Sequence, residues 1–247
     1  MNRPDILSSG EPEIDAITAQ CFVRFEEAFG TRGFAWDVQA QIMSLGKATE
    51  IGKGESATIF PDEDSLVFLA EGACKLVAWA ALDRAQVLSF HFAGDLVSVP
   101  ARAEHEYGLI ALTPSRILSF PTRRFLQAVN EESKLLVELH RRTDAALAEC
   151  RNDSVGLGRK TAQERVARLL MQMAGRIGIA SDNGVLIELP MSRGDIADSL
   201  GLTIETVSRQ FGELRDAGLI ETGGRSGVRV LDPEALLQRA GPTCPHV

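Results

Sequence analysis

The sequence lacks any apolar run approaching the roughly 18 residues that a membrane-spanning helix requires. Its amino-terminal stretch MNRPDILSSGEPE is too acidic and too polar for a secretory signal peptide. We therefore expect a cytoplasmic protein with no membrane partner. What remains is an ordinary globular composition, with 45% hydrophobic and 24% charged residues. A chain of 247 residues is long enough for two domains, each with its own core.

Cysteine and histidine are scarce, with four of each. The cysteines, which form no CxxC pair and have no histidine at ligand spacing, are Cys21, Cys74, Cys150 and Cys244. We therefore expect neither disulfides nor a structural zinc site. A cupin-like metalloenzyme would need several histidines and a carboxylate around a metal, whereas residues 48–121 offer only His91 and His105. No nucleophile and base stand together either, so the sequence predicts a protein that is not an enzyme.

An excess of positive charge is also absent, because 26 lysines and arginines face 34 acidic residues and the net charge is −8. Residues 1–158 carry the whole of this negative charge, with 15 basic and 23 acidic side chains. Residues 159–247 are balanced, with 11 of each sign. The arginines of this second part can still form a locally basic face, so the acidic total does not exclude nucleic acid as a partner.

Residues 48–121 consist of short apolar stretches separated by turn residues. This alternation favours a β-sandwich or a small barrel. The predicted turns, where glycine and aspartate tolerate the required backbone angles, lie at residues 61–64, 71–72, 83–84 and 93–95. Residues 17–29 have helical spacing and predict a helix in front of the strands.

The region after Pro121 predicts one long helix through residue 155, followed by a hinge at Gly156 and Gly158. Residues at alternating three- and four-residue steps can form the seam of a two-stranded coiled coil: Leu136, Leu139, Thr143, Ala146 and Cys150. The alternative is that this stripe packs only on the region of strands. We favour a homodimer, because the helix is long, its opposite face is charged, and it joins two differently patterned regions.

A helix-turn-helix is predicted within residues 192–214. Ser192 and Asp195 can form a capping box at the start of its first helix. Gly201 can adopt the left-handed conformation of a tight turn, and Thr203 can cap the second helix. At about 100° per residue, the second helix has an apolar side and a polar side. The apolar side consists of Val207, Phe211 and Leu214, and the polar side of Glu205, Ser208, Arg209 and Gly212.

Residues 218–231 predict two short strands around a glycine-rich turn, with Arg225 and Arg229 close to its tip. Such a hairpin would lie as a wing beside the helix pair. Any helical hairpin with a polar outer face shows a similar pattern, so the identities of the residues must decide whether this unit binds DNA.

Those identities are specific. The segment MSRGDIADSLGLTIETVSRQFGELRDAGLI, residues 191–220, resembles the DNA-binding segment of the CRP/FNR family of bacterial transcription regulators. Glu205, Ser208 and Arg209 resemble the pattern of the FNR and FixK branches, whereas the cyclic-AMP branch has glycine at the position of Ser208. The resemblance therefore implies a FixK-like or FNR-like regulator.

A second part of the chain carries the same resemblance less specifically. FHFAGDL, residues 90–96, resembles the β-roll motif of the family, and Gly72 stands where the roll normally has a turn glycine. The likeness covers about residues 45–240. It implies an α+β fold with an N-terminal β-roll (a cyclic-nucleotide-binding-like jelly roll), a long dimerisation helix and a C-terminal winged helix-turn-helix. We expect these three parts at residues 1–120, 121–157 and 158–247.

The polar side of the second helix has the chemistry to read bases. Arg209 is suited to donate two hydrogen bonds to O6 and N7 of guanine, the commonest specific contact in the major groove. Glu205 can accept from N4 of cytosine or N6 of adenine and can also brace the Arg209 guanidinium. Ser208 is small enough to approach a thymine methyl. Residues expected to hold phosphates, and so to set the register, are Arg193, Thr203 and Thr206.

The family resemblance also implies the partners. It implies a homodimer on double-stranded DNA, at a palindrome like TTGAT-N4-ATCAA that two recognition helices about 34 Å apart would read. It further implies an activator of genes for low-oxygen metabolism. Such an activator would contact RNA polymerase, and the turn at Asp83 and Arg84 is the candidate surface.

The ligands of the known cofactors in this family are largely missing. FNR-type sensors hold an iron–sulfur cluster with several amino-terminal cysteines, and this chain has only Cys21 there. Cyclic-nucleotide binders carry an Arg-Ser pair at the distance from Gly94 where this chain has His105 and Glu106; Arg102 could serve only in a shortened loop. We therefore expect a FixK-like roll that binds no cofactor.

A cofactor-gated regulator of the same family remains the alternative. It would use haem on His91 and His105, a small ligand, or a redox-active thiol at Cys74 or Cys150. The cupin-like metalloenzyme is a further alternative from a different class.

Overall fold

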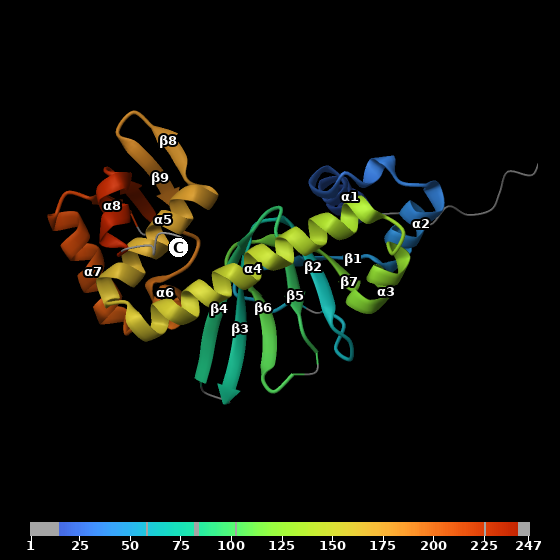
Figure 1. Ribbon diagram of the computed structural model, residues 1–247, viewed down its shortest axis with the longest axis horizontal. Coiled ribbons are helices and arrows are strands. Elements are labelled where there is room, and N and C mark those ends of the chain that lie inside the picture. Colours follow the sequence, from blue (N-terminus) through green and yellow to red (C-terminus); the bar gives the residue numbers. More distant parts are fainter. Residues whose placement is uncertain (1–14, 58, 82–83, 102, 225, 242–247) are drawn as a thin grey trace, which may run out of the picture.

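The computed structural model describes residues 15–57, 59–81, 84–101, 103–224 and 226–241. Figure 1 shows two bodies of packed secondary structure, one around the strands of residues 47–121 and one around the strands of residues 179–230. One long helix, α4 (Ser133–Arg159), runs across the first body and ends against the second. This order of a strand-rich part, a long helix and a second part with a small sheet confirms the predicted α+β class.

Two helices precede the strands. α1 (Ala16–Phe29) confirms the helix predicted over residues 17–29, and α2 (Trp36–Leu45) follows after the 3₁₀ turn η1 (Thr31–Gly33). Asp15 starts α1, because its carboxylate accepts a hydrogen bond from the backbone N–H of Thr18 at 2.9 Å. The aromatic rings that pack between α1, α3 (Thr122–Ala128) and the strands are Phe22, Phe25, Phe29, Phe68, Phe120 and Phe125.

The strands of residues 47–121, which we call the roll, form two antiparallel sheets, as predicted. One sheet contains, in spatial order, β1 (Lys47–Ile51), β7 (Ser115–Pro121), β2 (Ser65–Glu71) and β5 (Leu96–Val99). The other contains β4 (Arg84–Phe92), β3 (Ala73–Ala81) and β6 (Glu106–Ala111). β4 is therefore an edge strand of the roll.

Two of the predicted turns depend on glycine. Gly72 and Gly94 have φ angles of +92° and +93°, in the region that favours glycine. Asp95 closes the second of these turns, because its carboxylate accepts a hydrogen bond from the backbone N–H of Phe92 at 2.8 Å. The predicted turn at residues 83–84 begins outside the described residues, and β4 starts at Arg84.

The region after Pro121 forms two helices, so the prediction of one continuous helix is wrong. α3 ends at Ala128 with Val129 as its C-cap, and α4 begins at Ser133. Val129 is fully buried in the aromatic core of the roll, together with Phe125 from α3 and Leu135 from α4. Burial of side chains from both helices in one core overrides the continuous helical pattern.

The predicted hinge is also wrong, since Gly156 and Gly158 lie inside α4. A glycine within a helix costs only about 1 kcal/mol relative to alanine, so these two glycines do not end α4. The helix stops instead where Thr161 forms a capping box with Glu164 at the start of α5 (Ala162–Ile177). Two residues, Lys160 and Thr161, separate α4 from α5.

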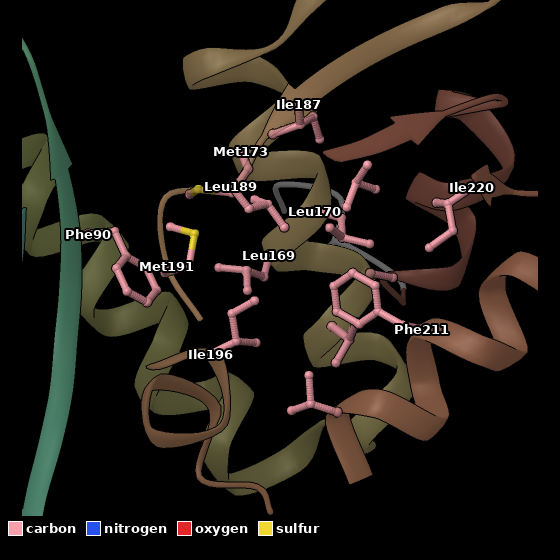
Figure 2. Packing of buried hydrophobic residues seen from close by; sticks show 14 of the residues in the cluster. Phe90, Leu169, Leu170, Met173, Ile187, Leu189, Met191, Ile196, Phe211 and Ile220 are labelled. Carbon is pink, nitrogen blue, oxygen red and sulfur yellow. The ribbon is translucent and has the colours of Figure 1, made fainter. Parts of the chain in front are cut away.

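The second body confirms the predicted helix-turn-helix with a wing. Its elements after α5 are β8 (Ile179–Ser181), β9 (Gly184–Glu188), α6 (Arg193–Leu200), α7 (Ile204–Asp216), β10 (Ile220–Gly223), β11 (Gly227–Val230) and α8 (Pro233–Arg239). The four strands pair antiparallel in the order β10-β11-β9-β8. Figure 2 shows side chains from α5, α7 and this sheet converging on one core, among them Leu170, Ile187 and Phe211.

None of the described helices is long and apolar enough to span a membrane.

Candidate nucleic-acid interface

Local hydrogen bonds set the two helices of the helix-turn-helix. The backbone N–H of Asp195 donates to Ser192 Oγ at 3.1 Å, and the backbone N–H of Ser192 donates to the Asp195 carboxylate at 2.8 Å. Gly201 ends α6 with a left-handed φ of +59°. Thr203 Oγ1 then accepts from the backbone N–H of Thr206 at 3.2 Å and starts α7. All the capping roles predicted from the sequence are therefore confirmed.

The two sides of α7 have opposite environments. Val207, Phe211 and Leu214 are buried in the core of the second body. The side chains on the other side that were predicted to read bases are all exposed: Glu205, Ser208 and Arg209. α7 therefore presents a polar surface on a helix whose apolar side holds it rigidly in place.

Arg209 has a weak acidic partner on its own helix. Its Nε lies 3.9 Å from Oε1 of Glu213, and the Arg209 side chain is 69% exposed. The neighbouring carboxylate is therefore that of Glu213, one turn further along, rather than the predicted Glu205. A long contact at such an exposed site is screened by water, so the guanidinium is free to turn toward another acceptor.

Glu205 carries a full negative charge at neutral pH. Hydrogen bonding at its own backbone N–H, and with the Thr203 hydroxyl, holds the pKa of Glu205 below its usual range. A carboxylate at this position can only accept hydrogen bonds and repels phosphates. It therefore suits contact with a donor on a base edge rather than with the DNA backbone.

The residues predicted to hold phosphates fall into two groups. Thr203 is exposed and Thr206 is half-buried, and their hydroxyls lie 3.1 Å apart at the start of α7, where the helix dipole favours an anion. Arg193 differs, because its guanidinium carbon lies 3.1 Å from the centroid of the Phe211 ring. Burial lowers the pKa of Arg193 to about 10, and among the described residues its Nη1 has no hydrogen-bond partner. The cation–π contact of Arg193 with Phe211 therefore helps to hold α7 on α6.

The wing lies in the small sheet beside the helices. Arg229 on β11 pairs with Glu221 on β10, with Nη1 and Oε2 3.2 Å apart. Ser226 at the turn donates to Glu188 of β9 at 2.9 Å, which ties the wing to the rest of the sheet. The other predicted wing arginine, Arg225, lies outside the described residues.

The predicted coiled-coil seam divides between two environments. Leu139 is 8% exposed and belongs to the core of the roll, and Leu136 is half-buried against the same core. The remaining members, Thr143, Ala146 and Cys150, are exposed. Sequence reasoning missed Leu147 and Leu157, which are 45% and 44% exposed on the same side of α4. The seven-residue repeat through positions 136, 143, 150 and 157 was the signal for Leu157.

The structure places the residues considered for cofactors in different environments. His91 lies 2.8 Å from Ser89 Oγ and 3.6 Å from the carboxylate of Asp95, whereas His105 is exposed. Cys74 is fully buried, and burial raises its pKa to about 11, so its thiol is protonated at neutral pH. Cys150 is exposed on α4. Within the ranges that the structure describes, no group of three or more His, Cys, Asp or Glu side chains could hold a metal ion.

Known proteins similar to this chain share both of its bodies. The Crp-like helix-turn-helix domain family matches residues 164–239. The nitrogen fixation regulation protein FixK of Bradyrhizobium diazoefficiens is 33% identical over 192 residues, which cover 76% of this chain and 80% of that protein. The transcriptional activator protein FnrA of Stutzerimonas stutzeri is 32% identical over 212 residues, covering 83% and 85%. The structure of FixK2 from Bradyrhizobium japonicum has a TM-score of 0.69 at 25% identity, covering 81% of this chain and 99% of that one.

These similar proteins are regulators of transcription and not enzymes, which confirms the prediction from the sequence. The likeness to FixK2 extends over roll, long helix and winged helix-turn-helix, so it is not limited to the DNA-binding part. The chain therefore belongs to the CRP/FNR family of DNA-binding transcription regulators and is a FixK-like member of it.

Proposed function

We propose that the protein acts as a homodimer that binds a palindrome like TTGAT-N4-ATCAA, with Glu205, Ser208 and Arg209 reading the bases. The observation that carries this proposal is the exposed polar side of α7, opposite a side that is buried. A helix held in this way can enter the major groove without losing its own packing.

Each of the three side chains has a matching partner on a base edge. Arg209 donates two hydrogen bonds to O6 and N7 of guanine, and Glu205 accepts from N4 of cytosine or N6 of adenine. Ser208, between them on the same side of α7, approaches a thymine methyl. Attraction to phosphates is independent of sequence, and the start of α7 at Thr203 and Thr206 supplies it together with the wing. Arg193 would add to this attraction when its guanidinium leaves the Phe211 ring and contacts a phosphate.

The exposed apolar stripe of α4 supports the dimer. Two copies of the stripe would pack along a common axis and remove these leucines from water, which favours association. A dimer in turn places two recognition helices about 34 Å apart, one turn of the DNA duplex, which explains why the target would be a palindrome. The side chains of this stripe are Leu136, Thr143, Leu147, Cys150 and Leu157.

We further propose that the protein activates genes for low-oxygen metabolism, which its FixK-like membership supports. Similar proteins carry the names transcriptional activator and nitrogen fixation regulation protein. An activator must contact RNA polymerase, and we propose the turn at Asp83 and Arg84 as that surface. The roll would serve this activity without a bound cofactor, so that the amount of protein sets the response.

The test of the proposed function is binding to a defined site at a fixed salt concentration. The purified chain should bind a duplex with both half-sites far more tightly than one with a single half-site or a scrambled sequence. Genome-wide mapping of bound sites should return the same palindrome upstream of genes induced at low oxygen. Equal binding to palindromic and scrambled duplexes would contradict sequence reading, and binding as a monomer would contradict the dimer.

A further inference from the structure

The roll and the winged helix-turn-helix touch directly, in addition to their connection through α4. Lys75 of β3 forms an ion pair with Asp195 of α6, and the two side chains are only 19% and 15% exposed. Asp195 is also the residue that closes the capping box with Ser192. Burial opposes ionisation of Asp195, but hydrogen bonds from Lys75 and Ser192 outweigh it and leave its pKa below the usual range. One carboxylate therefore holds the start of α6 and joins it to the roll.

Two further polar contacts link the same bodies. Gln86 Nε2 of the edge strand β4 donates to the carbonyl oxygen of Asp198 at 2.8 Å, one turn after Asp195 on α6. Arg176, in the last turn of α5, donates to the carbonyl oxygen of Phe90 at 2.9 Å and pairs with Asp95. The three attachments involve two different helices, so together they oppose rotation of the winged helix-turn-helix about any single axis.

An apolar contact fills the space between these attachments. In Figure 2, Phe90 points from β4 toward Met191 and Leu169 of the second body. These side chains belong to one buried cluster that also contains Met173 and Ile196 of the helices. A shared core of this kind resists sliding, because any displacement opens voids among closely packed side chains.

This contact leaves the reading surface free. Glu205, Ser208 and Arg209 remain exposed while α6 is held on the roll. The only covalent link between α4 and α5 is the two-residue joint at Lys160 and Thr161, which by itself permits rotation. The roll contact is thus an additional constraint on the angle between α7 and α4.

The geometry points to Lys75 as a positioning residue. By holding Asp195, Lys75 sets the separation between the two half-sites that the dimer can bind. This inference rests on the proposed function. Base preference within a half-site belongs to α7 alone, whereas the separation of two half-sites depends on how each winged helix-turn-helix is oriented on the shared dimer helices. Fixing that orientation in advance reduces the ordering that DNA binding would otherwise require.

The test uses the full-length chain and duplexes with two half-sites separated by three to seven base pairs, together with a duplex that carries one half-site. The variants are Lys75→Met, which keeps most of the stem and removes the charge, and Lys75→Arg, which keeps the charge. The matched control is Lys53→Met, which removes the charge of an exposed lysine on the roll. Binding is measured by fluorescence anisotropy at one salt concentration, and thermal unfolding is recorded for every variant.

The wild-type chain and Lys53→Met should show one preferred spacing. Lys75→Met should bind that spacing about tenfold more weakly, a typical coupling between sites, and should bind the other spacings with less discrimination. Its affinity for the single half-site and its preference among bases should stay at the wild-type level. Lys75→Arg should restore the spacing preference. Gln86→Ala, which removes a neighbouring attachment, should shift the profile in the same direction by a smaller factor and serves if Lys75→Met does not fold.

Three results would overturn the inference. A wild-type spacing profile in both Lys75→Met and Gln86→Ala would show that the contact does not orient α7. Tighter binding by Lys75→Met would show that the contact blocks DNA binding instead. An equal loss on every duplex, the single half-site included, would show that Lys75 only stabilises the fold. Failure of the wild-type chain to prefer any palindrome is a different result, because it contradicts the proposed function itself.

Discussion

The surface of the roll and the polar side of α7 differ in how closely their arginines are paired with acidic side chains. Arg116 on β7 has its Nε 2.7 Å from Glu50, and its Nη1 lies 3.2 Å from Glu71, so the charges of this surface are neutralised within the chain. On the exposed side of α7 the arginine contact is the 3.9 Å approach of Arg209 to Glu213. Charges that are paired internally contribute to the fold, whereas weakly paired charges remain available to an external partner.

The same contrast appears along α4. Toward the roll, Arg142 donates to the carbonyl oxygens of Gly94 and Ala28 and stacks on Phe29, so this side of the helix is fully engaged. The other side exposes Leu147 and Leu157, whose side chains are 45% and 44% exposed. The surfaces that stabilise the fold are therefore different from the surfaces that are available to DNA or to a second copy of the chain. The predictions below test this division, beginning with the largest effect.

Phe211→Ala should destabilise the winged helix-turn-helix by about 3–5 kcal/mol, because it removes a buried ring from the core below α7. DNA binding should be lost with it. Phe25→Ala should cost a similar amount in the core of the roll but should leave single half-site affinity intact at temperatures where the variant is folded. Urea unfolding measures the stability of both variants, and fluorescence anisotropy measures their affinity for a single half-site. Equal effects of both variants on half-site affinity would show that recognition is not confined to the second body.

Leu147→Glu should weaken dimerisation by about 3 kcal/mol, since both copies lose a leucine from the stripe and gain a charge. The control is Val137→Glu, at a position that is 68% exposed and outside the stripe, which should leave the dimer intact. Sedimentation equilibrium measures both. In a Cys244→Ser background, mild oxidation should also cross-link two copies through exposed Cys150. A monomeric wild-type chain, or dissociation by both variants alike, would disprove this seam.

Arg209→Ala should lower affinity for the palindrome by about 1–3 kcal/mol and relax the preference for guanine at one position of each half-site. The control is Arg215→Ala. Arg215 lies on the same helix but pairs with Asp216, so its removal should change affinity much less. Anisotropy with substituted duplexes at a fixed salt concentration separates the two roles. If Arg209→Ala weakened binding to specific and random duplexes equally, the side chain would be a phosphate contact and not a reader of bases.

The sequence predicted the helix-turn-helix well because its signals are local. The capping box at Ser192 and Asp195, the left-handed Gly201 and the cap at Thr203 each act within a few residues, and all three are present in the structure. Periodicity also separated the buried side of α7 from its exposed side. The general fold of the roll could be predicted for the same reason, from alternation and turn residues.

What the sequence could not predict depends on contacts between distant residues. The break at Val129 arises because that side chain enters a core built from strands and from α1, and no local residue signals it. The ion pair of Lys75 with Asp195 joins positions 120 residues apart. The stacking of Arg193 on Phe211 and the burial of Leu139 in the roll also follow from tertiary packing, which helical periodicity does not encode.

Glu138→Gln should have the smallest effect, on stability alone. Hydrogen bonds from Arg141 and Arg142 lower the pKa of Glu138 to about 2 from an ordinary value of 4.5. A carboxyl group whose pKa is depressed in the folded state stabilises the fold above its unfolded pKa and loses that contribution as the pH falls. The wild-type chain should therefore be more stable than Glu138→Gln at pH 7, by at most about 1 kcal/mol because the site is partly exposed.

That difference between the wild-type chain and Glu138→Gln should close as the pH falls from about 4.5 toward 2, the range between the two pKa values of Glu138. Urea unfolding across this range measures it, with Glu131→Gln as the control at an exposed position of the same region. DNA affinity at neutral pH should be the same for all three proteins, since the pair lies on the supporting side of α4. A loss of affinity in Glu138→Gln without a loss of stability would place this pair among the recognition surfaces and break the division between the two bodies.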